Sequence, residues 1–389
     1  MKILSVARGK FLFAITDRSY LLLGLVCLLC VGSAAQEFRQ VYPGIEHARV
    51  EHRIGEDPVA INVLRLDLRK VRLDVKLGMD QVVGTETTSS IAARHGALAA
   101  INAGFFRLDN SIFAGDPAGA LMTDGVLLSE SLNGRVAMMI ENGRVETKVE
   151  FERADLGYSI IIKAREFKAG INRERQADDI VIYTKAFGNT SLTRPGGVEF
   201  IVQNGRIRRI ITSDSSNPIP ENAYLISASG MQGNELRRLA RLNARVKIVV
   251  HHSSLDTMVP SSAFSRAEDI TNGVSHLIQN GKVALTWEAE KASRSFAESR
   301  HPRTAVAKMK DGKLLMITVD GRQPGVSVGM TLQEVAEYLL SLGAVDAINL
   351  DGGGSTTMVL DGKVMNKPSD ANGERKIGDA IIVSSRVRS

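Results

Sequence analysis

The chain has very few cysteines and few aromatic residues. Of its 389 residues, two are cysteine and one is tryptophan, and aromatic residues make up 5%. Both cysteines, Cys27 and Cys30, lie in an apolar stretch near the N-terminus that we expect to be removed, so the mature chain would contain none. Disulfide bonds, a thiolate nucleophile and cysteine-bound zinc are then excluded.

That apolar stretch has the pattern of a secretory signal peptide. Four basic residues precede the run Tyr20 to Val31, which ends in the small residues Gly32 to Ala35. The run is too short for a membrane span, which needs roughly 20 apolar residues. We therefore expect residues 1–35 to be cleaved and the protein to be exported, to the periplasm or beyond, without a stable membrane anchor.

The chain also lacks a strong charge of either sign. Residues 1–35 hold four basic residues and one acidic residue, so their removal lowers the formal net charge from +6 to +3. No block of like charge or alternation of aromatic and basic residues predicts nucleic-acid binding. The phosphate loop of NTPases, the nucleophile elbow of lipases and the zinc helix of metalloproteases are missing as well.

What the sequence does contain is a series of hairpin signals. An Asn-Gly or Asp-Gly pair between β-prone runs favours a type I′ turn, which needs a positive φ at both central residues. Such pairs begin at Asp124, Asn142, Asn204, Asn280, Asp311 and Asp361. Repeated pairs of this kind predict a sheet built largely from antiparallel hairpins.

Helices are few in the sequence pattern. Apolar spacing predicts one from Leu332 to Leu342, with a Thr331-x-x-Glu334 capping box and Gly343 as its stop. Shorter candidates are Ile91 to Gly96 and Glu235 to Asn243. The predicted fold class is α+β, a mixed and mostly antiparallel sheet with one βαβ unit near the C-terminus. We divide the mature chain into a strand-rich N-terminal extension, residues 36–97, and a main domain, residues 98–389.

The most informative segment is the turn that follows the predicted strand Ala344 to Leu350. Asp351 is followed by Gly352, Gly353 and Gly354, and then by Ser355 and Thr356. Glycines allow another group to approach the backbone closely, so this turn favours a polar ligand beside one carboxylate. A glycine-rich hairpin connector would give the same pattern.

The hairpin at Asp311-Gly312 predicts what lies near that turn. A two-residue turn would place Lys310 opposite Lys313 and Arg303 opposite Asp320. Strand 314–319, the helix and strand 344–350 form a β-loop-α-β unit, whose strands should be parallel. Asp320 and Asp351 should therefore leave the same sheet edge, where ligands bind in such sheets, and His301 and Arg303 should reach it from the partner strand.

Each of these residues also has a purely structural interpretation. Arg303 and Asp320 could form an ion pair, and Asp351 could cap its own turn. Asn102, at the end of the apolar run Ala99 to Ile101, could donate to a ligand oxygen or merely form a turn. The adjacent pair His251-His252 follows a strand, so the two rings point to opposite faces and are not expected to share a metal ion.

Four motifs resemble the phosphodiester glycosidase family. They are, in chain order, Ile101 to Phe106, His301 to Ala305, Val319 to Arg322 and Asn349 to Met358, and the resemblance covers residues 98–385. One departure is the segment Thr271 to His276, where members usually show a glycine-rich run ending in proline, so we expect a loop that lines the pocket to differ from theirs. The resemblance implies a bacterial exported hydrolase that acts on a carbohydrate or sugar-phosphate substrate. It would cleave a sugar-1-phosphodiester at the glycosidic bond to the phosphate, in a cell-envelope or extracellular glycan.

The resemblance also implies roles for the site residues. Arg303, His301, Arg322, Asn102, the glycine-turn N–H groups, Ser355 and Thr356 are expected to bind the substrate and its phosphate. Asp351 and, second, Asp320 are expected to act on the sugar. A separation of about 5 Å would argue for a retaining mechanism and one of about 6.5 to 9.5 Å for an inverting one.

Two other functions fit the same residues. In a metal-assisted phosphodiesterase, Asp320 and Asp351 would hold a divalent cation, the one cofactor that the sequence leaves possible. In a non-catalytic envelope protein, the same edge would bind glycans without turnover. The sequence leaves the sugar and the oligomeric state open.

Overall fold

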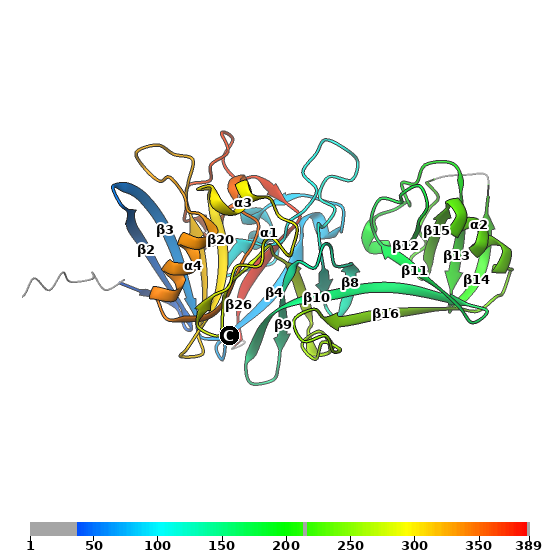
Figure 1. Cartoon of the computed structure of the whole chain (residues 1–389), viewed down its shortest axis with the longest axis horizontal. Coiled ribbons are helices and arrows are strands. Elements are labelled where there is room, and N and C mark those ends of the chain that lie inside the picture. Colours follow the sequence, from blue (N-terminus) through cyan, green and yellow to red (C-terminus); the bar gives the residue numbers. More distant parts are fainter. Residues whose placement is uncertain (1–36, 213–215, 387–389) are drawn as a thin grey trace, which may run out of the picture. The chain divides into compact units, whose positions relative to one another are not determined.

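A computed structural model describes residues 37–212 and 216–386 (Figure 1). The expected signal peptide, residues 1–35, lies outside these residues. The described residues from Phe38 onward form one compact unit. Within the described residues, no helix is long and apolar enough to cross a membrane.

An eight-stranded sheet carries most of the motifs. Its strand order is β1-β2-β3-β21-β20-β22-β18-β19. The bounds are β1 Arg39–Tyr42, β2 Ile45–Ile54, β3 Asp57–Leu66, β18 His276–Gln279, β19 Lys282–Val283, β20 Arg303–Met309, β21 Leu314–Val319 and β22 Ala344–Asn349. Strands β21 and β22 both pair antiparallel with β20, so they run parallel to each other on either side of it, as the βαβ prediction requires.

A five-stranded sheet has the order β24-β23-β6-β26-β4. Its strands are β4 Val71–Leu77, β6 Ala99–Asn102, β23 Met358–Leu360, β24 Lys363–Val364 and β26 Asp379–Ser385. A two-stranded sheet, β5 Glu86–Thr87 with β25 Lys376–Ile377, completes this part of the chain. The glycine turn therefore links β22 of one sheet to β23 of another.

The remaining strands form an eleven-stranded sheet around the long strand β10. They are β7 Leu121–Thr123, β8 Val126–Ser129, β9 Val136–Asn142, β10 Thr147–Ile162, β11 Arg165–Ile171, β12 Ile180–Tyr183, β13 Gly197–Gln203, β14 Arg206–Ile211, β15 Tyr224–Ser229, β16 Val246–Ser254 and β17 Asp269–Asn272. In Figure 1, β10 and β16 run side by side along most of their length. Strands β11 and β12 are parallel, whereas the other ladders among the described strands are antiparallel, which confirms a mostly antiparallel fold.

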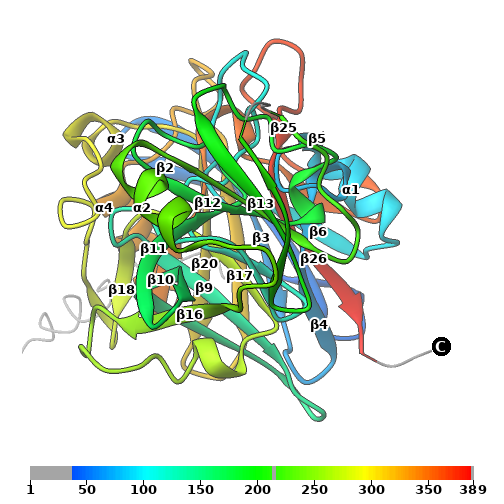
Figure 2. The same ribbon diagram turned by 90° about the vertical axis from the view of Figure 1, so that its right-hand side faces the viewer.

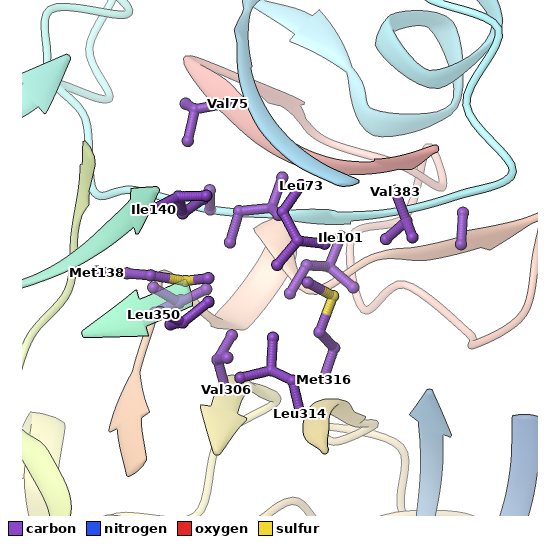
Figure 3. Packing of buried hydrophobic residues seen from close by; sticks show 14 of the residues in the cluster. Leu73, Val75, Ile101, Met138, Ile140, Val306, Leu314, Met316, Leu350 and Val383 are labelled. Carbon is purple, nitrogen blue, oxygen red and sulfur yellow. The ribbon is translucent and has the colours of Figure 1, made fainter. Parts of the chain in front are cut away.

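The main core lies between the eight-stranded and five-stranded sheets. Figure 3 shows Val306 and Met316 of the first sheet facing Leu73, Ile101 and Val383 of the second. Burying such side chains removes apolar surface from water at about 25 cal/mol per Å². Helix α4 (Leu332–Ser341) packs on the outer face of the eight-stranded sheet (Figure 1). Helix α1 (Thr88–Arg94) packs on the outer face of the five-stranded sheet, beside β6 and β26 (Figure 2).

The strongest helix prediction is confirmed. Helix α4 begins after Thr331, whose hydroxyl accepts the Glu334 N–H while the Glu334 carboxylate accepts the Thr331 N–H. Gly343, with φ 89°, follows its end. The predicted helix 91–96 begins three residues earlier, as α1. A short helix, α3 (Arg294–Glu298), precedes the His301 motif.

The predicted helix 235–243 is displaced toward the N-terminus. Helix α2 spans Gly230–Leu239 and ends where Ala240 becomes extended. Its beginning is set by Asp178, whose carboxylate accepts the Gln232 N–H at 3.0 Å across the fold. A local sequence pattern cannot predict a cap from a distant residue, which explains why the predicted start of this helix is misplaced.

Four of the six predicted type I′ turns are present. Both central residues have positive φ at 124–125, 204–205, 280–281 and 361–362, and each pair joins two paired strands. Asn142 is not in this conformation, and β9 and β10 are joined by the longer loop 143–146.

The predicted register of the β20–β21 hairpin is wrong by one residue. Only Gly312 has a positive φ in this turn, and the Met309 N–H donates to Lys313 O. The loop therefore has three residues and ends in a left-handed glycine, a common alternative to the two-residue turn. Arg303 consequently lies opposite Val319, not Asp320.

Candidate functional site

The backbone on both sides of Asp351 is held by the strand that ends at Asn102. The Asp351 N–H donates to Ala103 O at 2.9 Å. The Asn102 Nδ2 donates to Asp351 O at 2.7 Å. The Gly352 N–H donates to the Asp351 carboxylate at 2.9 Å. The turn is thus fixed at the junction of two sheets, and the position of the carboxylate is fixed with it.

The ionisation of Asp351 is perturbed by its surroundings. Burial of the carboxyl group raises its pKa to about 6, and the charge of Asp379 acts in the same direction. The Ser355 hydroxyl, the Gly352 N–H and the guanidinium of Arg375 lower the pKa, but by less in total. A carboxylic acid that titrates near neutral pH can exchange a proton during a reaction, and such groups concentrate at functional sites.

The three glycines allow close approach of neighbouring groups. A Cβ on Gly352 would lie 2.7 Å from Pro302 O. Gly353 has φ 61°, and its Cβ would lie 3.1 Å from the Arg322 guanidinium. A Cβ on Gly354 would collide with Arg375 and Asp370. A side chain at Gly352 or Gly354 would therefore displace its neighbours, and one at Gly353 would need a strained backbone and a small shift of Arg322.

The expectation that glycine N–H groups bind phosphate is only partly compatible with this geometry. The Gly352 N–H is used by the Asp351 carboxylate. The Gly353 N–H donates to Pro302 O at 2.9 Å. Ser355 and Thr356 are buried; the Ser355 hydroxyl interacts with the Asp351 carboxyl group, whereas the Thr356 hydroxyl has no hydrogen-bond partner among the described residues. The Thr356 hydroxyl, rather than the first two N–H groups, remains available to a ligand.

Asn102 is fully buried and its amide is already in use. Its Oδ1 accepts from the Thr304 hydroxyl at 2.8 Å and from the Thr357 N–H at 3.0 Å. Together with the bond to Asp351 O, these contacts join three chain segments at one amide. The geometry favours a supporting role for Asn102 over direct substrate contact.

Arg303 is also buried, with 1% of its surface exposed. Its Nε donates to Met330 O at 2.8 Å, and its Nη2 donates to Phe296 O at 2.7 Å and Ser299 O at 3.0 Å. Burial and, to a smaller extent, the charge of Arg322 lower its pKa to about 10, although the charge of Glu334 acts in the opposite direction. Arg303 thus organises the loop around α3 and makes no ion pair with any described residue.

His301 and Arg322 lie together above the turn. Arg322 Nη2 is 3.5 Å from His301 Nδ1, and the Arg322 side chain is exposed. Burial, followed by the charges of Arg303 and Arg322, lowers the pKa of His301. The imidazole is therefore neutral at pH 7, beside two cations that have no acidic partner among the described residues.

Asp320 is directed toward a different loop. Its Oδ1 accepts from Asn366 Nδ2 at 3.0 Å and from the Lys367 N–H at 3.1 Å, and its Oδ2 accepts from the same N–H. Asn366 in turn donates to Thr356 O at 3.0 Å. Asp320 thus supports the glycine turn through Asn366. Within the described residues, no group of three acidic, histidine or cysteine side chains is arranged to hold a metal ion.

Asp379 was missed by the sequence reasoning. It begins β26, and its backbone oxygen accepts the Ala103 N–H at 3.1 Å, so Ala103 lies between Asp379 and Asp351. Its carboxylate accepts from the Gly104 N–H and the Thr271 hydroxyl. Burial raises its pKa to about 6. No motif surrounds Asp379; only pairing of β26 with β6 reveals its position.

The histidine pair behaves as its strand position predicts. His251 Nε2 lies 2.6 Å from the Ser159 hydroxyl, whereas the His252 ring stacks on Phe264 with 4.8 Å between centroids. The two rings therefore have different partners.

Alanine at position 354 should disrupt the turn. The added methyl group would occupy the space of the Arg375–Asp370 ion pair, whose Nε–Oδ2 distance is 2.8 Å. We expect Gly354→Ala to lower the free energy of unfolding by about 2 kcal/mol or more, as overpacking does in a filled site. Denaturant unfolding measures this loss. Gly362→Ala is the comparison, because its Cβ would meet nothing within 4 Å although its φ is 70°, so only backbone strain is introduced. Equal losses in the two variants would contradict the crowding argument.

Comparison with known proteins agrees with the motifs. Residues 196–384 match the sequence model of a family described as phosphodiester glycosidase. N-acetylglucosamine-1-phosphodiester alpha-N-acetylglucosaminidase of Mus musculus is 31% identical over 179 residues, which cover 44% of this chain and 33% of that protein. The Bos taurus protein of the same name is 32% identical over 189 residues, covering 46% of this chain and 34% of that protein.

The chain spans about a third of the length of these two relatives in the matched region. The family match begins after Asn102, so the first motif lies outside it. A solved structure of a hypothetical protein from Synechocystis has a TM-score of 0.74 at 24% identity, covering 88% of this chain and 62% of that one. This likeness shows that the fold is shared.

Proposed function

Because the chain belongs to the phosphodiester glycosidase family through residues 196–384, we propose that it hydrolyses the bond between a sugar's anomeric carbon and the oxygen of a phosphodiester. The observation that carries this proposal is Asp351, whose enclosed carboxyl group has a pKa of about 6 and is fixed in a turn surrounded by arginines. The names of the matched relatives describe the same bond type.

The electrostatic balance around Asp351 suits an anionic substrate. Arg303 and Arg322 form no ion pair with a described residue, whereas Arg375 is paired with Asp370. A phosphate leaving group is a weak base, so stabilising its charge matters more than protonating it. Unpaired guanidinium groups beside the turn can supply that stabilisation.

Asp351 is proposed to act on the sugar, as the nucleophile or as the base that activates water. Both roles need the ionised carboxylate, which exists above a pH of about 6. Asp379 is the second carboxylate that acts electrostatically on Asp351. The contacts of Asp320 with Asn366 and Lys367 support a positioning role for that residue.

We further propose that the enzyme works outside the cytoplasm on a cell-envelope or extracellular glycan. The support is the signal-peptide pattern of residues 1–35, with its basic start, apolar run and small residues before the expected cleavage point. Fractionation of cells that express the full chain would test this location.

A donor screen in oxygen-18 water tests the proposed reaction. UDP-N-acetylglucosamine and simpler sugar-1-phosphodiesters should release free sugar, with the heavy oxygen in the sugar and not in the phosphate. Heavy oxygen in the phosphate would instead indicate a phosphodiesterase. Saturable binding without turnover of any donor would indicate a glycan-binding protein.

A further inference from the structure

Arg135 is a cation close to Asp351 that no motif contains. It immediately precedes β9, and its side chain is partly buried. Burial lowers the pKa of its guanidinium, and the charges of Glu290 and Asp351 act in the opposite direction. The Arg135 guanidinium lies over the ring of Phe105, two residues after Ala103, whose backbone oxygen accepts the Asp351 N–H, so Arg135 lies near the candidate site.

The guanidinium of Arg135 is incompletely satisfied. Its Nη1 donates to Ala118 O, but its Nε is buried without a hydrogen-bond partner among the described residues. It also makes no ion pair with a described carboxylate. Removing a charge from water without a counterion costs several kcal/mol, so such a group favours binding an anion.

The acid with the largest electrostatic effect on Arg135 is already hydrogen-bonded to other groups. Glu290 is buried, and its Oε2 accepts from the Val136 N–H at 3.2 Å and the Ser275 N–H at 2.8 Å. Its Oε1 accepts from the Thr286 hydroxyl at 2.5 Å. These neutral donors already satisfy the carboxylate, and it forms no ion pair with Arg135, whose Nε stays without a partner among the described residues.

Aromatic side chains connect Arg135 to the Arg303 side of the site. The Arg135 guanidinium lies 5.4 Å from the centroid of the Phe105 ring. Phe105 meets Phe296 edge to face at 5.9 Å, and Arg303 lies 5.1 Å from the Phe296 centroid. Stacking of this kind holds a guanidinium plane in a fixed orientation without consuming its N–H donors.

The other arginines near the turn are differently engaged. Arg303 donates to three backbone carbonyls, Arg375 is paired with Asp370, and Arg322 is exposed to water. Among these four, Arg135 combines partial burial, an unpartnered N–H and no acidic partner in the described chain.

We propose that Arg135 is a substrate-binding residue whose guanidinium binds the non-bridging oxygens of the substrate phosphate beside Asp351. This inference rests on the proposed function, because it assigns a residue to the anionic part of the same substrate. A planar fork can donate to two oxygens of one phosphate, which a lysine cannot reproduce.

The test compares a charged with a neutral leaving group. UDP-N-acetylglucosamine carries the phosphate, whereas p-nitrophenyl α-N-acetylglucosaminide does not. Arg135→Gln should raise KM for the first donor by about 10- to 100-fold, as loss of charged hydrogen bonds does. Its kcat/KM for the neutral donor should stay within about threefold of the original value. Similar losses for both donors, or none for the phosphate donor, would overturn the inference.

Two further variants control for folding and for general charge. Arg135→Lys keeps the charge and should give a KM for the phosphate donor between those of the unaltered protein and of Arg135→Gln. If Arg135→Gln does not fold, the KM of Arg135→Lys provides the test. Arg153 is the matched control, because it is an arginine on the neighbouring strand. It lies on β10 opposite Val136 of β9, and its Nε donates to Gly134 O at 3.0 Å. Arg153→Gln should leave the ratio of kcat/KM for the phosphate donor to kcat/KM for the neutral donor unchanged. If Arg153→Gln changes this ratio as much as Arg135→Gln does, Arg135 has no specific role.

A direct binding experiment separates this inference from the proposed function. If the unaltered protein turns over neither donor, the proposed reaction fails, but titration calorimetry with inorganic phosphate still tests Arg135. At least tenfold weaker binding by Arg135→Gln would support the inference. Equal affinities, or no phosphate binding by the unaltered protein, would refute it.

Discussion

Replacing Asp351 with asparagine is expected to reduce turnover of a sugar-1-phosphodiester by roughly 10³- to 10⁵-fold, the range seen when a nucleophile or base is removed. An amide cannot attack the anomeric carbon or accept a proton from water. The hydrogen bond from the Gly352 N–H can still be accepted by the new side-chain oxygen, so the turn should keep its shape. Product release measured with both proteins at equal concentration checks the loss.

The same substitution should stabilise the fold at neutral pH. Burial raises the pKa of Asp351 to about 6, so the folded state favours the protonated acid more than the unfolded state does. The associated stability is therefore present below a pH of about 4 and is lost as the pH rises through about 6. At pH 7 the asparagine variant should be more stable by up to about 3 kcal/mol, the equivalent of roughly two pKa units.

Urea unfolding at several pH values measures this effect. The difference between the two proteins should grow between pH 4 and pH 6 and then remain constant. The activity of the unaltered enzyme should rise over the same interval, because ionised Asp351 is the active form. A variant less stable than the original at pH 7 would show that Asp351 is not held in the surroundings described for it.

Asp320→Asn is the informative comparison, since both acids follow strands of the eight-stranded sheet. Asp320 accepts hydrogen bonds from Asn366 and the Lys367 N–H, so its replacement should weaken the loop and lower activity only moderately. A loss of activity as large as that of Asp351→Asn would show that Asp320 takes part in the chemical step.

Local sequence patterns predict the elements whose stability is local. Helix α4 carries its own cap and stop, and the turn at Asn204-Gly205 needs only its two residues to adopt positive φ. The hairpin at Asp311-Gly312 shows the limit of this reasoning. Its composition fits a two-residue and a three-residue loop alike, and the choice shifts every cross-strand pair by one.

The site is less predictable because several of its parts meet only through tertiary structure. The motif containing Asp351 predicts a turn that binds a ligand. The parallel arrangement of β21 and β22 is predicted because a helix connects them in the chain. Asp379 and Arg135 have no local signature, since one begins an ordinary strand and the other precedes one. Arg303 is predicted as a phosphate ligand, and the carbonyl groups that accept from its Nε and Nη2 come from backbone that no motif places.

The second large effect is expected at Asn102, whose buried amide supports the backbone of Asp351. Asn102→Ala removes the partner of the Thr304 hydroxyl, of the Thr357 N–H and of one acceptor site on Asp351 O. Buried polar groups left without partners cost about 1–3 kcal/mol each, and we expect a total loss of about 3–5 kcal/mol in the free energy of unfolding. Because Asp351 is no longer held on that side, turnover by the folded fraction should fall by about 100-fold.

Asn142→Ala separates loss of stability from loss of positioning. The Asn142 amide also joins two chain segments, donating to Leu73 O at 2.8 Å and accepting from the Thr147 hydroxyl at 2.8 Å, but it does not contact the glycine turn. It should therefore reduce stability while leaving kcat unchanged at a temperature where both variants are folded. If Asn142→Ala lowers kcat as much as Asn102→Ala, the loss reflects general loosening of the sheets. If kcat falls only with Asn102→Ala, the buried amide acts by fixing the backbone from which Asp351 reaches the substrate.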